Sequence, residues 1–288
     1  MTNDTNAQIT PAQNIRLATE QDIPALSHIW RECFDDPEEY IRFFYSLNFS
    51  EIAVPVYVAD GEPVSMLHLF DSEFKNGEER RKAKLIYAAG TIPDHRNKGY
   101  MRALIKYVSE QALQGGYALF LKPATPYLEE YYSKFGFRKD ACFRTVTTDN
   151  GAKTRTGDAV FTDISPEDYN RLRCAAFSSH PYAGWSDAHV CCCIKENAFC
   201  GGKTLAVALD GKTHFLMGSP RGKHYLITET DLTPAQLGRI SPALRELTGF
   251  RTIRAFLPDF ACGDGEETVS SVVFNAQLVN TYVNLIMI

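Results

Sequence analysis

One contiguous segment, from Lys84 to Phe137, constrains the fold of this chain more than any other. It begins with a β-rich run, Leu85 to Thr91, which leads through a turn directly into an amphipathic helix. A second strand is expected at Tyr117 to Lys122, followed by a helix that leads into Tyr131 to Phe137. The order of these parts is as informative as the turn that connects the first strand to the first helix.

The turn itself, His95 to Met101, has the features of a phosphate-binding site. Successive backbone N–H groups in such a turn, with the N-terminus of a helix behind them, form a pocket for phosphate oxygens. Gly99 lets the backbone approach a ligand closely, because glycine has no Cβ. The residues expected to line this pocket are Arg96, Asn97, Lys98, Gly99, Tyr100 and Met101.

The segment as a whole resembles the coenzyme-A-binding half of the GNAT (Gcn5-related) N-acetyltransferase family. In that family an Arg/Gln-x-x-Gly-x-Gly/Ala turn holds the pyrophosphate, and a Tyr-x-Lys-x-Gly-Phe segment lies near the thioester sulfur. Arg96 to Met101 matches the first pattern, with Met101 in place of the final Gly or Ala, and Tyr132 to Phe137 matches the second. The resemblance implies an α/β (α+β) fold with a mixed central sheet flanked by helices. It also implies acetyl-CoA as co-substrate, without a metal, and Tyr132 as the acid that protonates the leaving thiolate.

The charges around the turn agree with an anionic ligand. From Arg80 to Lys106 the chain carries eight Lys or Arg residues and one acid, Asp94. A basic region beside a phosphate turn is what an anionic cofactor needs. The stretch Arg80 to Lys82 is better interpreted as a solvated loop, which leaves Arg96, Lys98 and Arg102 for phosphate.

The reaction implied by the resemblance is attack of an amine on the thioester in a ternary complex. Bringing an alkylamine to its free base at pH 7 costs roughly 4–5 kcal/mol, because its pKa is about 10.4. Desolvation, or a base reached through water, would supply that free energy. Donors on the strand before the turn, at Ala89, Gly90 and Thr91, are expected to hold the thioester carbonyl.

The general base is not evident from the sequence. His68 lies on a predicted strand, where a hydrogen-bonded core histidine is more common than a base. Glu38, Glu39 and Tyr40 are candidates for an acceptor groove, although the two glutamates fit a solvated helix face better. The acceptor stays open among small amines, aminoglycoside-like polyamines and peptide amines.

The chain divides into two similar halves in the sequence. The predicted parts are a disordered tail at 1–13, a catalytic GNAT domain at 14–146, a linker at 147–157 and a degenerate GNAT-like domain at 158–288. Both halves have a strand followed by a helix cap, and both have an Asp-Gly hairpin, at Asp60-Gly61 and Asp210-Gly211. The second half enters its later helix at Thr233-Pro234 without an Arg-x-x-Gly-x-x turn. The whole resembles enhanced-intracellular-survival-type acetyltransferases without their sterol-carrier-like domain.

Composition excludes several other classes. A net charge of −5 argues against a nucleic-acid binder, and the absence of a long apolar run predicts no membrane span. The polar N-terminus lacks the features of a signal peptide, and no two cysteines have Cys-x-x-Cys spacing, so we expect a cytoplasmic protein with reduced cysteines. Homo-oligomerisation stays open.

Two alternative functions remain at this stage. The chain could be a non-catalytic CoA-binding sensor or interaction protein, or an acyltransferase with another acyl-CoA donor. In related multidomain enzymes the terminal carboxylate reaches the active site. The resemblance leaves open whether it does so here or whether Tyr282 to Ile288 is an ordinary sheet strand.

Overall fold

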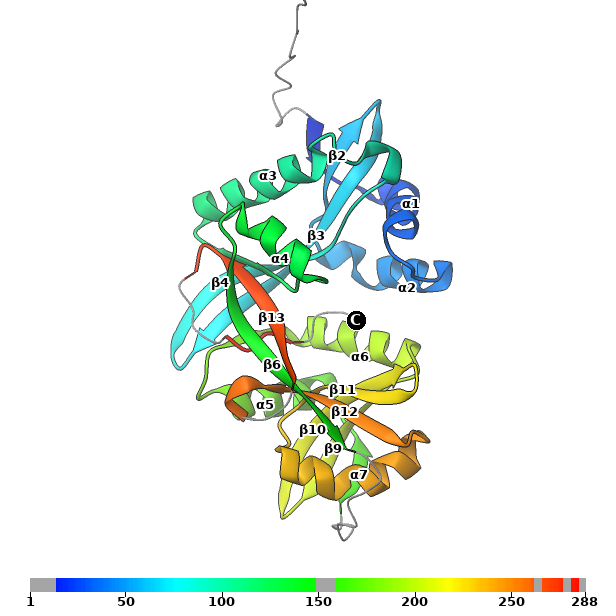
Figure 1. Cartoon of the computed structure of the whole chain (residues 1–288), viewed down its shortest axis with the longest axis vertical. Helices are drawn as coiled ribbons and strands as arrows, with labels where there is room; N and C mark the ends of the chain where they lie inside the picture. The colour runs from blue at the N-terminus through cyan, green and yellow to red at the C-terminus, as the bar shows by residue number, and fades with distance from the viewer. Residues whose placement is uncertain (1–13, 149–158, 262–265, 277–280, 285–288) are drawn as a thin grey trace, which may run out of the picture. The chain divides into compact units, whose positions relative to one another are not determined.

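The computed structural model describes residues 14–148, 159–261, 266–276 and 281–284 (Figure 1). The predicted tail, most of the predicted linker and the chain's last four residues lie outside the described residues. Two compact units make up the chain: the first combines Met1–Phe70 with Leu85–Gly116, and the second combines Asp71–Lys84 with Tyr117–Ile288. The predicted domain boundaries stay a prediction.

The first unit contains a sheet with helices on both faces (Figure 1). Its elements are β1 (Ile15–Leu17), α1 (Ile23–Cys33), α2 (Glu38–Asn48), β2 (Pro55–Ala59), the first part of β3 (Glu62–Asn76), the second part of β4 (Glu79–Thr91) and α3 (Tyr100–Gly115). Short 3-10 turns occur at Glu20–Asp22, Phe49–Glu51 and Pro93–His95. The strands follow in the order β1-β2-β3-β4, and β2 pairs antiparallel with both of its neighbours.

Local sequence signals set the ends of these elements. The Thr19 backbone N–H donates to the Asp22 carboxylate at 2.7 Å, in the capping box predicted before α1. Asp60 and Gly61 both have positive φ, 55° and 89°, as the predicted two-residue hairpin between β2 and β3 requires. These predictions are confirmed.

An aromatic core packs between α1, α2 and the sheet. Trp30 lies at its centre, with ring centroids 4.5 Å from Phe44 and 5.4 Å from His68. His68 is 0% exposed, and its Nε2 lies 3.1 Å from the Tyr45 hydroxyl. The expectation that His68 is a core histidine is confirmed. On the opposite face, Tyr100 of α3 packs against β2.

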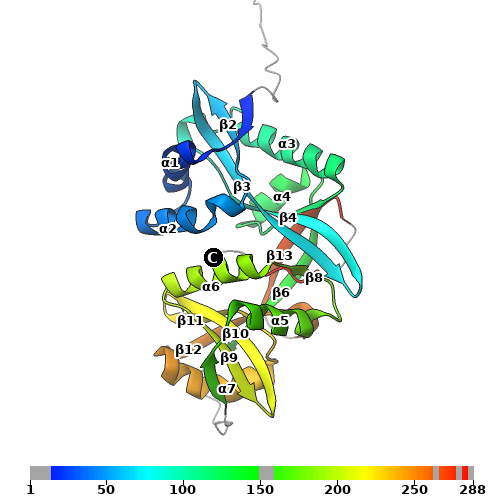
Figure 2. The same ribbon diagram turned by 180° about the vertical axis from the view of Figure 1, so that it is seen from behind.

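The second unit is built on a longer, mixed sheet (Figure 2). Its strands are β5 (Ala118–Leu121), β6 (Arg138–Thr148), β7 (Val160–Asp163), β8 (Tyr182–Gly184), β9 (Lys203–Leu209), β10 (Lys212–Arg221), β11 (His224–Thr230), β12 (Thr252–Pro258) and β13 (Glu266–Phe274). Its helices are α4 (Pro126–Ser133), α5 (Pro166–Phe177), α6 (Asp187–Phe199), α7 (Pro234–Thr248) and a 3-10 turn at Asp259–Ala261. The order is β5-β13-β6-β12-β11-β10-β9-β7, and β8 pairs with the end of β3. β11 and β12 are parallel, so the predicted mixed α/β fold is confirmed.

The position of β13 has no counterpart in the sequence analysis. This strand comes from the C-terminal part of the chain but lies between β5 and β6, where Val273 aligns with Phe120 on one side and Arg138 on the other. The predicted strand at Tyr282 is represented, in the described residues, by an isolated bridge from Tyr282 to Tyr182.

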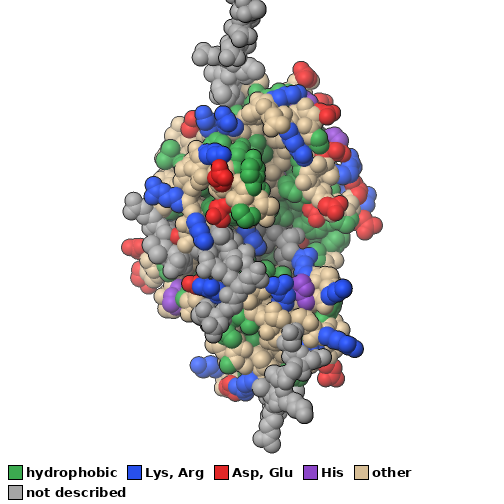
Figure 3. All heavy atoms as spheres, in the orientation of Figure 1, with side chains coloured by type: hydrophobic (Ala, Val, Ile, Leu, Met, Phe, Trp, Pro, Cys, Tyr) green, Lys and Arg blue, Asp and Glu red, His purple; other side chains and the backbone are tan. Residues whose placement is uncertain are grey.

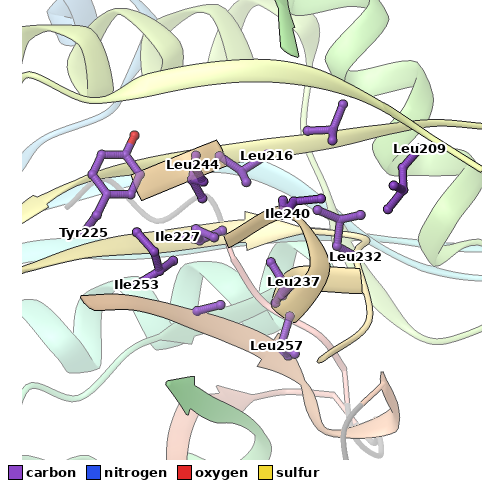
Figure 4. Packing of buried hydrophobic residues seen from close by; sticks show 12 residues of the cluster. Leu209, Leu216, Tyr225, Ile227, Leu232, Leu237, Ile240, Leu244, Ile253 and Leu257 are labelled. Carbon is purple, nitrogen blue, oxygen red and sulfur yellow. The ribbon is translucent and has the colours of Figure 1, made fainter. Parts of the chain in front are cut away.

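Aliphatic residues fill the space between α7 and the sheet of the second unit (Figure 4). Leu237, Ile240 and Leu244 from α7 pack with Ile227 and Ile253 from β11 and β12, and all five are at most 1% exposed. The helix begins at the predicted Thr233-Pro234 cap, where Thr233 and Gln236 form a capping box. These residues form an apolar core in the C-terminal part of the second unit.

A buried ion pair occupies the opposite side of that sheet. Arg173 of α5 donates from Nε to Glu229 of β11 at 2.9 Å, and both side chains are fully buried. The Tyr169 hydroxyl donates to the other Glu229 oxygen at 2.9 Å. Desolvation of a charge costs several kcal/mol, so removal of one partner is more destabilising than loss of a surface pair.

Arg173→Met is therefore expected to lower the free energy of unfolding by about 3–5 kcal/mol, because it leaves Glu229 buried without its cation. Arg171→Met is the matched control, since Arg171 lies on the same helix and pairs with Asp168 at 2.8 Å in an exposed position. It should change stability little. Urea denaturation measures both, and equal losses would contradict this interpretation.

A second stability prediction concerns pH. Burial lowers the pKa of His68 to about 4 from 6.5. The unfolded chain therefore takes up this proton first, and the stabilisation present above pH 6.5 is lost as the pH falls toward 4. The expected loss is about 3 kcal/mol. Urea midpoints of wild type and His68→Asn between pH 7.5 and 4 isolate the effect, because the difference between the two curves should shrink toward low pH.

Candidate functional site

The predicted phosphate turn joins β4 to α3 in the first unit. After the 3-10 turn that ends at His95, the backbone turns sharply, and Asn97 and Gly99 both adopt positive φ, 63° and 85°. Gly99 is the N-cap of α3. No heavy atom lies within 4 Å of a Cβ built on Gly99, so glycine is favoured here by its backbone conformation.

The backbone N–H groups of this turn are candidates for binding a ligand. Ala103 is the first residue of α3 whose N–H is bonded within the helix, to the Gly99 carbonyl at 2.9 Å. The N–H groups from Asn97 to Arg102 make no hydrogen bond to any residue that the structure describes, and no side chain caps the helix. Six successive donors at a helix N-terminus are an arrangement that binds anions in proteins, and the assignment of phosphate to this turn stays a prediction.

The side chain of Arg96 contacts protein. Its Nε donates to the Thr91 carbonyl at 3.0 Å, and its Nη2 donates to the Glu32 carbonyl at 3.4 Å. The Cys33 thiol donates to the same Thr91 carbonyl at 3.2 Å. Arg96 thus fastens the turn to the ends of β4 and α1. Its predicted contact with phosphate stays a prediction.

The remaining turn residues divide into exposed and packed ones. Asn97 and Lys98 are exposed, so the Lys98 ammonium is free to meet an anion. Tyr100 stacks on Tyr57 of β2, with ring centroids 4.2 Å apart, and this contact anchors the first turn of α3. Met101, the residue that departs from the family pattern, is half-buried.

The end of β4, where Ala89 to Thr91 are expected to hold a carbonyl, is tightly packed. A Cβ on Gly90 would lie 2.9 Å from the Cys33 sulfur, so only glycine allows α1 to approach this strand. Ser65 donates from its hydroxyl to the Gly90 carbonyl at 3.2 Å. The contacts of Cys33, Ser65 and Tyr57 that support the turn could not be predicted from the sequence, because each residue lies far from the turn along the chain.

Tyr132 lies on α4 in the second unit. Its ring is 7% exposed and packs edge-on against Tyr131 and Phe137. Burial raises the pKa of Tyr132 to about 12, so the hydroxyl is protonated at neutral pH. That hydroxyl makes no hydrogen bond to a residue within the described ranges. Its action together with the turn of the first unit stays a prediction.

The acceptor-groove candidates do not form a cluster of exposed polar groups. Tyr40 is 5% exposed and packs against Trp30 at 6.2 Å between ring centroids. Glu38 is exposed and pairs with Arg31 at 3.1 Å, which agrees with a solvated helix face.

The corresponding turn of the second half is closed to an anion. Between β11 and α7, the Thr233 side chain accepts from the Gln236 N–H, and Gln236 accepts from the Thr233 N–H at 2.9 Å. The preceding Asp231 carboxylate accepts from the Phe215 N–H at 3.0 Å. The capping box therefore uses N–H groups at the start of α7, and an acid lies beside them. This agrees with the predicted lack of a cofactor site, while the degenerate second GNAT-like domain stays a prediction.

Comparison with known proteins gives a family match for the first part of the chain. Residues 14–139 match the acetyltransferase (GNAT) domain family. This part of the chain is therefore similar to a GNAT domain, and the match supports an acyltransferase role. No curated protein matches the chain.

Solved structures extend the likeness over most of the chain. A conserved protein from Enterococcus faecalis V583 shares 11% identity over 90% of this chain and 71% of that one, with a TM-score of 0.69. A GCN5-related N-acetyltransferase from Kribbella flavida shares 14% over 91% and 70%, with a TM-score of 0.63. Eis1 from Mycobacterium abscessus shares 12% over 84% of this chain and 65% of Eis1, with a TM-score of 0.58. At these identities the likeness establishes the fold.

Two further features bear on the remaining expectations. Within the described ranges no helix is long and apolar enough to cross a membrane, and no group of three or more His, Cys, Asp or Glu side chains is placed to hold a metal ion. On the face shown in Figure 3, basic and acidic side chains are interspersed.

Gly99→Val should abolish binding of acetyl-CoA, because a β-branched residue does not adopt a φ of +85° without strain and the row of N–H donors would be displaced. Gly61→Val is the matched control: its φ is +89° and a Cβ there also meets nothing within 4 Å, but it lies in the β2–β3 hairpin. Calorimetric titration should show binding by wild type and by Gly61→Val. Equal binding by Gly99→Val would show that the turn is not the phosphate site.

Proposed function

We propose that this protein is an acetyl-CoA-dependent N-acetyltransferase that transfers an acetyl group to a primary amine by direct attack in a ternary complex. The row of N–H donors from Asn97 to Arg102, within a GNAT domain, is the observation that carries the proposal. A pyrophosphate supplies the acceptor oxygens that these donors lack, and the positive end of the α3 dipole favours its charge. Lys98 adds an exposed cation at the same turn.

The bound co-substrate would supply an activated acetyl thioester. In the transfer the acetyl carbon forms a bond to the amine nitrogen, and its bond to sulfur breaks with the electron pair moving to sulfur. The amine must arrive as the free base, which costs a lysine-like amine roughly 4–5 kcal/mol at pH 7. N–H groups of Ala89, Gly90 and Thr91 are the proposed donors to the carbonyl oxygen, where charge develops.

Tyr132 is the proposed hydrogen-bond donor to the leaving sulfur. Its raised pKa, about 12, keeps the hydroxyl protonated, and it has no competing acceptor among the described residues. A thiol with a pKa of about 8.5 is the stronger acid, so complete transfer from this tyrosine is unfavourable by roughly 5 kcal/mol. We therefore propose that Tyr132 donates a hydrogen bond to the developing thiolate, while the amine proton leaves to water or to another base.

A mass-spectrometric screen of primary amines with acetyl-CoA tests the activity. A product heavier by one acetyl group, formed with stoichiometric CoA, is the expected result, and the acceptor that reacts fastest defines the small-molecule or peptide amine class. Binding of CoA without turnover on any amine would support a sensor or interaction protein instead. Turnover only with longer acyl-CoA thioesters would identify a different donor. Cytoplasmic location and the lack of nucleic-acid and membrane partners remain part of the proposal.

Tyr132→Phe keeps the ring packing and removes the hydroxyl, so it should lower the rate of acetyl transfer by about 10²–10³-fold, the cost of losing one donor to a developing charge. Acetyl-CoA affinity should stay within a few-fold, since the phosphate turn is unchanged. Tyr131→Phe, a half-buried neighbour on the same helix, is the control and should be close to neutral in both measurements. A wild-type rate for Tyr132→Phe, with chemistry rate-limiting, would make Tyr132 a packing residue.

A further inference from the structure

One residue inside β4 has an unusual backbone. Ala88 adopts a φ of +43°, although it is not glycine and lies three residues before the end of the strand. A non-glycine residue in this region costs on the order of 1–3 kcal/mol and persists only where its surroundings fix it. Such a kink in a strand changes the direction of the residues that follow. The residues that follow are Ala89 to Thr91, the proposed donors to the thioester carbonyl.

His68 of β3 lies against this kink. Its Nδ1 is 3.3 Å from the Tyr87 carbonyl, and its Nε2 is 3.1 Å from the Tyr45 hydroxyl. Because a carbonyl only accepts, we assign the proton to Nδ1. Nε2 is then an acceptor for the Tyr45 hydroxyl, whose other neighbour is the Met66 sulfur at 3.7 Å. The ring is therefore held at both ends, in a neutral form with a pKa of about 4.

Aromatic side chains pack around the ring of Tyr87, the residue before the kink. Phe44 stacks on Tyr87 with ring centroids 5.8 Å apart and an interplanar angle of 25°, and Trp30 lies 6.0 Å from the same ring. His68 is fully buried behind them, so an amine substrate has no route to it in this conformation. A role as the missing general base is therefore excluded by its place in the core.

We propose that His68 is a positioning residue: its hydrogen bond to the Tyr87 carbonyl holds the kink at Ala88 and so directs the N–H groups of Ala89 to Thr91 toward the acyl carbonyl. The inference rests on the proposed function for the identity of that carbonyl. In this proposal, the hydrogen bond of His68 positions the donors to the acyl carbonyl, independently of the contacts that hold the phosphate turn. It also gives a role to a polar side chain that lies in an aromatic core.

The test compares the affinities of CoA and acetyl-CoA, because CoA has the pyrophosphate but no carbonyl. His68→Leu should bind CoA as the wild type does and should lose about 3- to 10-fold in its affinity for acetyl-CoA, the worth of one hydrogen bond. His68→Asn keeps an N–H near the position of Nδ1 and should retain most of the wild-type preference. Tyr45→Phe, which releases the other end of the ring, should show a smaller loss.

Rescue separates positioning from general damage to the core. Ala88→Gly removes the cost of positive φ, so His68→Leu/Ala88→Gly should regain part of the preference for acetyl-CoA. A packing defect would not respond to glycine at position 88. If His68→Leu keeps the wild-type ratio of the two affinities, or if Ala88→Gly leaves a lost ratio unchanged, His68 does not act in this way. If the wild type binds neither ligand, the proposed function itself fails.

Should His68→Leu not fold, His68→Asn and Tyr45→Phe provide the same comparison in milder form. The affinities for CoA and for acetyl-CoA are both measured by calorimetry on the full chain, and neither measurement needs an acceptor amine. A change in the ratio for Tyr45→Phe that Ala88→Gly reverses would support the inference. An unchanged ratio in both variants would overturn it.

Discussion

The proposed site depends on the start of α3, where no side chain caps the helix. Most helices satisfy their first N–H groups with a side chain, as α7 does through Thr233 and Gln236. At α3 the donors from Asn97 to Arg102 have no such partner among the described residues. Unpaired donors lower stability unless water or a ligand satisfies them. Their presence in one half of the chain and their closure in the other are the physical basis for assigning the ligand to the first half.

The surrounding structure keeps those donors in place by contacts that are distant in sequence. Arg96 and Cys33 both donate to the Thr91 carbonyl, Tyr57 stacks on Tyr100, and Gly90 permits α1 to approach the strand. The strand before the helix is irregular near its end in both halves. In β4, Ala88 has a positive φ. In β11, the register with β10 shifts, so that no residue of β10 is aligned with Thr228. In the second half Glu229, which follows Thr228, is paired with Arg173. In the first half an aromatic cluster packs beside the irregular strand instead.

Local signals in the sequence predicted much of this fold. The Thr19 cap, both Asp-Gly hairpins, and the starts of α5 and α7 depend on nearby residues and were predictable. The insertion of β13 between β5 and β6 was not, because strand pairing over such a distance leaves no local pattern. The contacts of the Arg96 side chain with the carbonyl groups of Thr91 and Glu32 were not predicted from the sequence either, and its contact with phosphate stays a prediction. Positive φ at Ala88 was equally hidden, since alanine gives no sign of it.

The most direct measurement is an amide NMR titration of the full chain with CoA, because it reads the proposed donors themselves. Our account predicts that the N–H signals from Asn97 to Arg102 shift on addition of CoA. It also predicts that they stay in place with pantetheine, which lacks the pyrophosphate, while amides at the start of α7 respond to neither. Binding of CoA that shifts the α7 amides, or that leaves those from Asn97 to Arg102 unchanged, would contradict it.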